Sequence, residues 1–100
     1  MTALIQTAIQ MMDKARSPYS NYRVGAAVET IENKIIGGCN VENASYPLSN
    51  CAERTALFTA TAEGYSQFKG LAVATVNGGF PCGACRQVIW EICGDIPIYI

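Results

Sequence analysis

The first sixteen residues carry apolar side chains at helical spacing. Their positions are three or four residues apart, so they share one side of a helix over residues 2–16. They are Leu4, Ile5, Ala8, Met11, Met12 and Ala15. Ser17-Pro18 should end this helix, because the residue before a proline is pushed out of the helical region. The pattern therefore predicts an amphipathic helix whose apolar stripe packs against a core.

The next stretch changes to short apolar runs of the kind found in strands. Residues 24–28 and 34–41 predict two strands of an antiparallel hairpin, and their many small residues predict a close approach by another element. Residues 51–63 predict a second helix. Asn50 can cap its start and Gly64 can end it.

The last third of the chain predicts two more strands with a helix between them. Residues 70–76 are nearly all apolar, as expected of a strand that is covered on both faces. A helix from about 82 to 94 and a strand over 96–100 follow. The predicted order is αββαβαβ. Helices in crossover connections imply an α/β fold with a mixed sheet and helices packed against it.

Composition and charge limit the kind of partner. One hundred residues, half of them apolar, are enough for one domain over residues 1–100. The net charge is −1 and no basic run occurs, so we expect no nucleic-acid partner. No run approaches the ~20 apolar residues that span a bilayer, and the N-terminus does not resemble an export signal. Five cysteines without such a signal fit a reducing cytoplasm and metal binding better than disulfides.

Three of these cysteines have the spacing of a catalytic zinc site. Cys51 opens one predicted helix, and Cys82 and Cys85 lie in the first turn of another, where the helix dipole favours the thiolate form. Catalytic zinc has three protein ligands and one open position, whereas structural zinc is closed by four. A fourth ligand here would have to be Cys39, Cys93 or a carboxylate, because the chain has no histidine. Both of those cysteines are more typical of small buried residues.

Residues beside Cys51 can supply the rest of the chemistry. Three thiolates and one Zn²⁺ sum to −1, and Arg54 is the residue best placed to offset that charge by hydrogen bonds to sulfur; Gln87 is a weaker candidate. Glu53 can take a proton from the metal's water and pass it to a substrate nitrogen. Its alternative role is to pair with Asn50 in a helix cap.

The two motifs together resemble a known family. The segments CAER (51–54) and PCGACRQ (81–87) closely resemble the zinc-dependent cytidine deaminases, of the small homotetrameric type with three cysteines. The resemblance extends over nearly the whole chain and implies a three-layer αβα fold with one Zn²⁺ per chain. It implies that zinc-bound hydroxide attacks C4 of cytosine while Glu53 shuttles protons. Cytidine and 2′-deoxycytidine would then yield uridine, 2′-deoxyuridine and ammonia, in pyrimidine salvage.

The resemblance also implies contacts to the nucleoside. Tyr22 would stack on the pyrimidine, and Asn40 and Glu42 would hold the ribose 3′-hydroxyl. An aromatic face suits a flat base, and an amide and a carboxylate suit sugar hydroxyls. The backbone N–H of Ala52 would bond to the ring.

Further implications concern neighbouring subunits. In a homo-oligomer, a tetramer in this family, Ala44 and Tyr46 would reach the site of a neighbour. Relatives continue with a further strand and helix beyond the position of Ile100, so we expect the C-terminal part of the family fold to be missing here.

Two other functions stay open at this level. The chain could deaminate a modified cytosine nucleoside, as the blasticidin-type enzymes do, although Asn40 and Glu42 favour an ordinary ribose. It could also be a structural zinc module or an inactive deaminase-like partner. In that case Glu53 would be dispensable and a fourth ligand would be expected.

Overall fold

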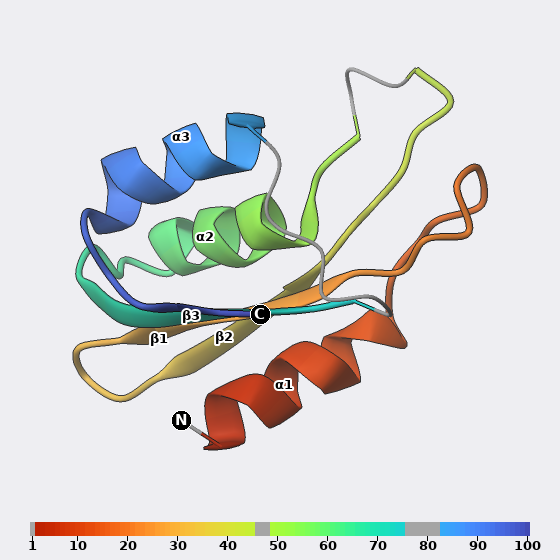
Figure 1. The fold of residues 1–100 in the computed structure, drawn as a ribbon. Coiled ribbons are helices and arrows are strands. Elements are labelled where there is room, and N and C mark those ends of the chain that lie inside the picture. The colour runs from red at the N-terminus through yellow and green to blue at the C-terminus, as the bar shows by residue number, and fades with distance from the viewer. Residues whose placement is uncertain (1, 46–48, 76–82) are drawn as a thin grey trace.

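The predicted order of helices and strands is confirmed. The computed structural model describes residues 2–45, 49–75 and 83–100, and their elements follow one another as αββαβαβ. The elements are α1 (Thr2–Met12), β1 (Gly25–Thr30), β2 (Ile35–Cys39), α2 (Ala52–Ala62), β3 (Phe68–Ala74), α3 (Gly83–Cys93) and β4 (Ile98–Tyr99). Figure 1 shows α1 on one face of the sheet and α2 with α3 on the other, which gives three layers.

The sheet is mixed, as predicted. Its strand order is β2-β1-β3-β4. Strand β1 is antiparallel to both β2 and β3, and β4 runs parallel to β3. Ala27 is in register with Gly37 on one side and with Ala72 on the other, so β1 lies inside the sheet. The helix α3 makes the crossover between the two parallel strands, as parallel pairing requires.

Two apolar clusters fill the spaces between the layers. Successive side chains of a strand point to opposite faces, so Ala26 and Val28 pack toward α2 and α3 whereas Ala27 packs toward α1. The smaller cluster joins Leu4 and Ala8 of α1 to the sheet. The larger cluster comprises Ala26, Val28, Ile36, Ala52, Ala56, Leu57, Ala60, Phe68, Leu71, Val73 and Ile89. Both faces of the sheet are therefore covered, which explains the continuous apolar run of β3.

The predicted close approach of another element to the hairpin occurs at Gly38. A Cβ atom at this position would lie 2.7 Å from the carbonyl oxygen of Ala52 and would meet the backbone nitrogen of Ala56 more closely still. Both atoms belong to the backbone of α2, which cannot move aside without moving the whole helix. Glycine at position 38 therefore lets the start of α2 rest directly on β2.

Gly38→Ala is expected to lower Tm by roughly 5 °C or more, because a clash with helix backbone costs about 1–3 kcal/mol in a domain of this size. Thermal unfolding of the purified variant measures the effect. Gly70→Ala is the matched control, since a Cβ there meets only side-chain atoms at ordinary contact distances, Leu4 Cδ2 at 3.4 Å and Tyr99 Cε2 at 3.7 Å. Equal Tm values for the two variants would show that α2 is not held against β2 in this way.

Three elements are shorter than predicted by more than one residue at an end. Helix α1 ends at Met12 rather than Arg16, because Arg16 forms a β-bridge with Val41: its N–H donates to Asn40 O at 3.0 Å. Residues 13–15 still turn, with N–H groups bonded three residues back. Strand β2 ends at Cys39 and not at residue 41, and β4 keeps two of the five predicted residues, 98 and 99. Within the described residues, no helix is both long enough and apolar enough to cross a membrane.

Candidate active site

The start of α2 brings together three of the predicted site residues. Cys51 is the N-cap, with extended backbone angles of φ −72° and ψ 157°, and the helix proper begins at Ala52. The prediction that Asn50 caps this helix was wrong. Asn50 exchanges two backbone hydrogen bonds of 2.9 Å with Val41, which hold it in a β-bridge and delay the helix by one residue. Glu53 is therefore the second helical residue, and the alternative role in a cap with Asn50 does not apply.

Glu53 is buried although it is a carboxylate. Only 4% of its surface is exposed, and Ala52 beside it is fully buried. Burying a carboxylate is unfavourable unless other groups compensate, and the positive end of a helix dipole is one such group. A buried acid at a helix N-terminus, two residues from a cysteine, is suited to hold and transfer a proton. It does not have the role of a solvent-exposed surface carboxylate.

Arg54 contacts the sulfur of Cys51. Its Nη2 atom lies 3.4 Å from Cys51 Sγ, within reach of a hydrogen bond to sulfur. A guanidinium in this position favours the thiolate over the thiol. The donor set therefore fits a zinc ion at the Cys51 end of α2, because a thiolate is the ligand that zinc binds there.

The other two predicted ligands come from the start of α3. Cys85 lies in this helix, but its side chain falls outside the part of the chain that the structure describes, as does the whole of Cys82. Helix α3 begins at Gly83 and packs against α2. The described residues alone contain no group of three potential metal ligands, so the trio of sulfurs stays a prediction. Gln87 is exposed on α3, and its role also stays a prediction.

Asn40 and Glu42 lie on the segment that leaves β2, next to the start of α2. The Val41–Asn50 bridge joins their segment to the residue that precedes Cys51. The Asn40 amide holds the opposite chain at two points: Oδ1 accepts from Val24 N–H at 2.9 Å, and Nδ2 donates to Tyr22 O at 2.8 Å. The structure therefore brings the predicted sugar-binding and base-stacking residues onto neighbouring segments, one that leads into β1 and one that leaves β2.

The Glu42 carboxylate is bound to the loop that carries Tyr22. Oε1 accepts from the backbone N–H groups of Tyr19 at 3.0 Å and Ser20 at 3.1 Å, and Oε2 accepts from the Ser20 hydroxyl. Hydrogen bonds hold the pKa of Glu42 below the usual range of a glutamate. They come from the hydroxyl and the backbone N–H of Ser20 and from the backbone N–H of Tyr19, and burial opposes their combined effect. Sequence analysis missed Ser20. A serine two residues before Tyr22 was a usable signal, since serine hydroxyls often accept the N–H of residue i+2.

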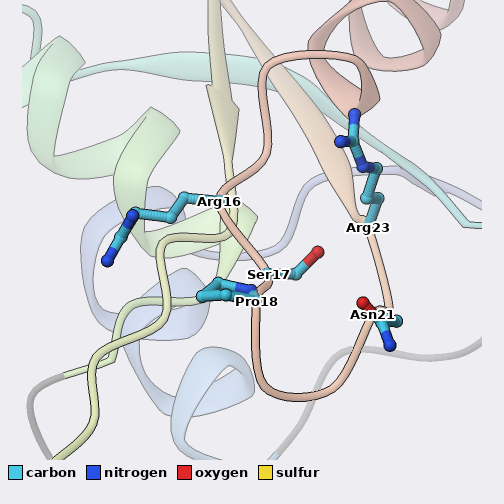
Figure 2. A pocket seen from close by; sticks show the side chains of 5 residues that line it. All are labelled: Arg16, Ser17, Pro18, Asn21 and Arg23. Atoms are coloured by element: carbon cyan, nitrogen blue, oxygen red, sulfur yellow. The ribbon is translucent and has the colours of Figure 1, made fainter.

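The same loop encloses an open hollow of about 320 Å³. Figure 2 shows the chain passing around it from Arg16 to Arg23, with these two side chains pointing in different directions. The loop reverses at Asn21, whose φ of 56° is a left-handed value that asparagine tolerates, and Asn21 N–H donates to Ser17 O at 3.0 Å. Arg23 Nη1 donates to Asp13 O at 3.1 Å. These bonds fix the path of the loop on which Tyr22 lies.

The remaining predicted site residues are partly described. Ala44 is exposed, whereas Tyr46 lies outside the described residues. Cys39 and Cys93 are partly buried rather than fully buried. Burial raises the pKa of both thiols, that of Cys93 to about 11, although Lys14 opposes the effect at Cys39. A raised pKa disfavours the thiolate form in which cysteine binds zinc.

The chain is similar to known proteins over nearly its whole length. The family model of the cytidine and deoxycytidylate deaminase zinc-binding region matches residues 1–99. A cytidine deaminase from Sporosarcina psychrophila is 47% identical over 100 residues, which cover 97% of this chain and 74% of the relative. The crystal structure of cytidine deaminase from Burkholderia pseudomallei has a TM-score of 0.88 and 55% identity, over 93% of this chain and 76% of that one. The enzyme from Mycobacterium tuberculosis has a TM-score of 0.91 and 36% identity, over 99% and 83%. The chain therefore belongs to the zinc-dependent cytidine deaminase family.

Proposed function

We propose that this chain hydrolyses cytidine to uridine and ammonia, consuming one water per turnover. The observation that carries the proposal is the placement of buried Glu53 two residues from Cys51. The sulfur of Cys51 accepts a hydrogen bond from the Arg54 guanidinium. The relatives named above are cytidine deaminases, which supports the same reaction. They give no support to a modified cytosine nucleoside as substrate.

Cys51, Cys82 and Cys85 would hold the zinc ion. When bound, zinc supplies a water that is acidic enough to act as a nucleophile near neutral pH. Glu53 would take one proton from that water on its carboxylate and deliver it to the ring nitrogen of the base. It would then take the second proton, from the hydroxyl group added at C4, and pass it to the amino group, so that the C4–N bond breaks, ammonia leaves and the C4 carbonyl of uridine forms. The N–H of Ala52, in the first turn of α2, orients the ring. Because Glu53 is buried, bulk water does not compete for this proton.

Arg54 tunes the site through sulfur. Three thiolates would give the metal site a net charge of −1, which makes a bound water harder to deprotonate. The guanidinium 3.4 Å from Cys51 Sγ withdraws part of that charge. Gln87 is a second candidate for the same task.

The nucleoside would lie between residues 40–42, which follow β2, and the loop 19–24. Tyr22 would stack on the base, and Asn40 and Glu42 would hold the ribose 3′-hydroxyl. The hydrogen bonds between Asn40 and the backbone on each side of Arg23 support this placement, because they fix the backbone that carries Tyr22 relative to Asn40. Since these contacts avoid the 2′ position, 2′-deoxycytidine should be accepted as well.

Tyr22→Ala is expected to raise KM for cytidine by roughly tenfold and to change kcat less than about threefold. Loss of base stacking removes ~1–3 kcal/mol of binding that is equal in the ground and transition states. Steady-state kinetics measures both constants, with Tyr22→Phe as the control that keeps the ring. A fall in kcat at unchanged KM would contradict a role in gripping the base.

The assembly and its setting follow the family. One Zn²⁺ per chain, a homotetramer in which Ala44 and Tyr46 reach a neighbouring site, a cytoplasmic location and a place in pyrimidine salvage are parts of the same proposal. The chain matches about three quarters of the length of these relatives.

The direct test is to add cytidine to the purified zinc-loaded protein. The ultraviolet spectrum should change to that of uridine while one ammonia appears per uridine formed. Cytidine 5′-monophosphate is the comparison substrate, since the sequence has no basic run of the kind that holds phosphates. Zinc-loaded protein that leaves cytidine unchanged would overturn the proposal.

A further inference from the structure

Ser20 makes three contacts that join the two halves of the nucleoside site. Its hydroxyl donates to Glu42 Oε2, its backbone N–H donates to Glu42 Oε1 at 3.1 Å, and its Oγ accepts from Tyr22 N–H at 3.0 Å. Ser20 and Glu42 are 22 residues apart in the sequence. One side chain therefore connects the carboxylate for the sugar to the backbone that carries the ring for the base.

The hydrogen bonds to Glu42 also determine which position of the carboxylate is left for a ligand. A carboxylate has about four lone-pair positions on its two oxygens. Tyr19 N–H and Ser20 N–H use both positions of Oε1, and the Ser20 hydroxyl uses one position of Oε2. Among the residues that the structure describes, this leaves one position, on Oε2. Its direction is set by the Ser20 hydroxyl on the same oxygen.

We propose that Ser20 is a positioning residue for the nucleoside sugar: it aims the Glu42 lone pair that the described residues leave open at a sugar hydroxyl, and it holds the backbone of Tyr22 beside that carboxylate. This inference rests on the proposed function and deepens it. Ser20 does not touch the base or the reacting atoms. It acts through Glu42 and through the backbone of Tyr22.

The charge state of Glu42 supports the same role. A carboxylate accepts a sugar hydroxyl best when it is ionised. The Ser20 hydroxyl is the largest of the effects that hold the pKa of Glu42 below its usual range. The other ionisable side chains on the segments around Glu42 are Arg16, Tyr19, Tyr22, Arg23, Cys51, Glu53 and Arg54.

Ser20→Ala should raise KM for cytidine about tenfold, the usual effect of losing a hydrogen bond to a charged group, and change kcat less than about twofold. Without the hydroxyl, the pKa of Glu42 rises toward its ordinary value. Binding that needs the ionised form is present above that pKa and is lost as the pH falls through it. The acid-side loss of kcat/KM should therefore begin at a higher pH in the variant than in the wild-type enzyme.

A cycle with 3′-deoxycytidine tests the contact itself. In the wild-type enzyme, removal of the 3′-hydroxyl should lower kcat/KM by about tenfold or more. In Ser20→Ala this penalty should shrink to about twofold to threefold, because the two changes remove parts of one interaction. Ser20→Thr keeps the hydroxyl and should restore both the KM and the penalty. Ser66→Ala, an exposed serine between α2 and β3, is the matched control and should behave as wild type.

The outcomes separate the two claims. Wild-type enzyme without cytidine turnover would overturn the proposed function and this inference with it. Normal wild-type turnover, together with a Ser20→Ala variant that keeps the wild-type KM, acid limb and 3′-hydroxyl penalty, would overturn the role of Ser20 alone. A lower kcat at unchanged KM, or a Ser20→Thr variant that fails to recover, would also contradict it.

Discussion

Glu53→Gln should keep the fold and the zinc content but lose roughly 10²–10⁴-fold in kcat. Glutamine has nearly the same shape as glutamate and can fill the buried position at the start of α2, yet it cannot take up and release a proton. The steric fit of the site is thus retained while the proton path is removed. Metal analysis, thermal unfolding and initial rates with cytidine measure the three properties on one preparation.

Glu63→Gln is the matched control for this experiment. Glu63 is the exposed C-cap of the same helix, so the variant loses one carboxylate from α2 without changing the buried end. Its rates should equal those of the wild type. Turnover by Glu53→Gln at more than about a tenth of the wild-type rate would remove Glu53 from the chemistry.

Cys51→Ser should bind zinc far more weakly and unfold at a lower temperature. Serine is a favoured N-cap, so the start of α2 is kept while the thiolate is lost. Loss of a ligand should exceed the roughly 10–100-fold that outer contacts contribute to metal affinity. Metal binding is coupled to folding, and each ~1 kcal/mol lost lowers Tm by about 4–8 °C in a domain of this size. Competition with a chelator and thermal unfolding with and without zinc measure the two effects.

Cys93→Ala separates ligand loss from thiol loss. Burial raises the pKa of Cys93 to about 11, which disfavours the thiolate form that zinc binds. The variant should keep its metal and its zinc-dependent rise in Tm. A Cys51→Ser protein with wild-type zinc affinity would show that the ion, if bound, is held elsewhere.

The order of elements could be predicted because each depends on local patterns. The helical spacing in residues 2–16, the apolar run of β3 and the glycines at the ends of α2 and α3 all report local preferences. Gly64 and Gly94 do adopt the left-handed values, φ 96° and 71°, expected after a helix. The boundaries that failed depend on contacts between distant segments. The bridges of Val41 with Arg16 and with Asn50 decide where α1 ends and α2 begins, and no local pattern predicts them.

The candidate site shows the same division between local patterns and contacts of distant segments. Cys51, Glu53 and Arg54 are adjacent in the sequence, so their grouping at one helix end followed from their spacing, and the contact of Arg54 with Cys51 Sγ agrees with it. Ser20 was overlooked because its partner Glu42 is 22 residues away and the contact exists only once the loop folds against the β2 exit. A short-range motif can mark such a serine as a turn residue, but it cannot name the carboxylate that the turn presents.

X-ray absorption at the zinc edge of the substrate-free protein distinguishes a site of three sulfurs with one position open beside Glu53 from a closed site. We expect three Zn–S distances of about 2.3 Å and one lighter oxygen neighbour at roughly 2.0–2.2 Å. Four sulfur neighbours would mean a closed structural site and would contradict the assignment of this chain as a catalyst.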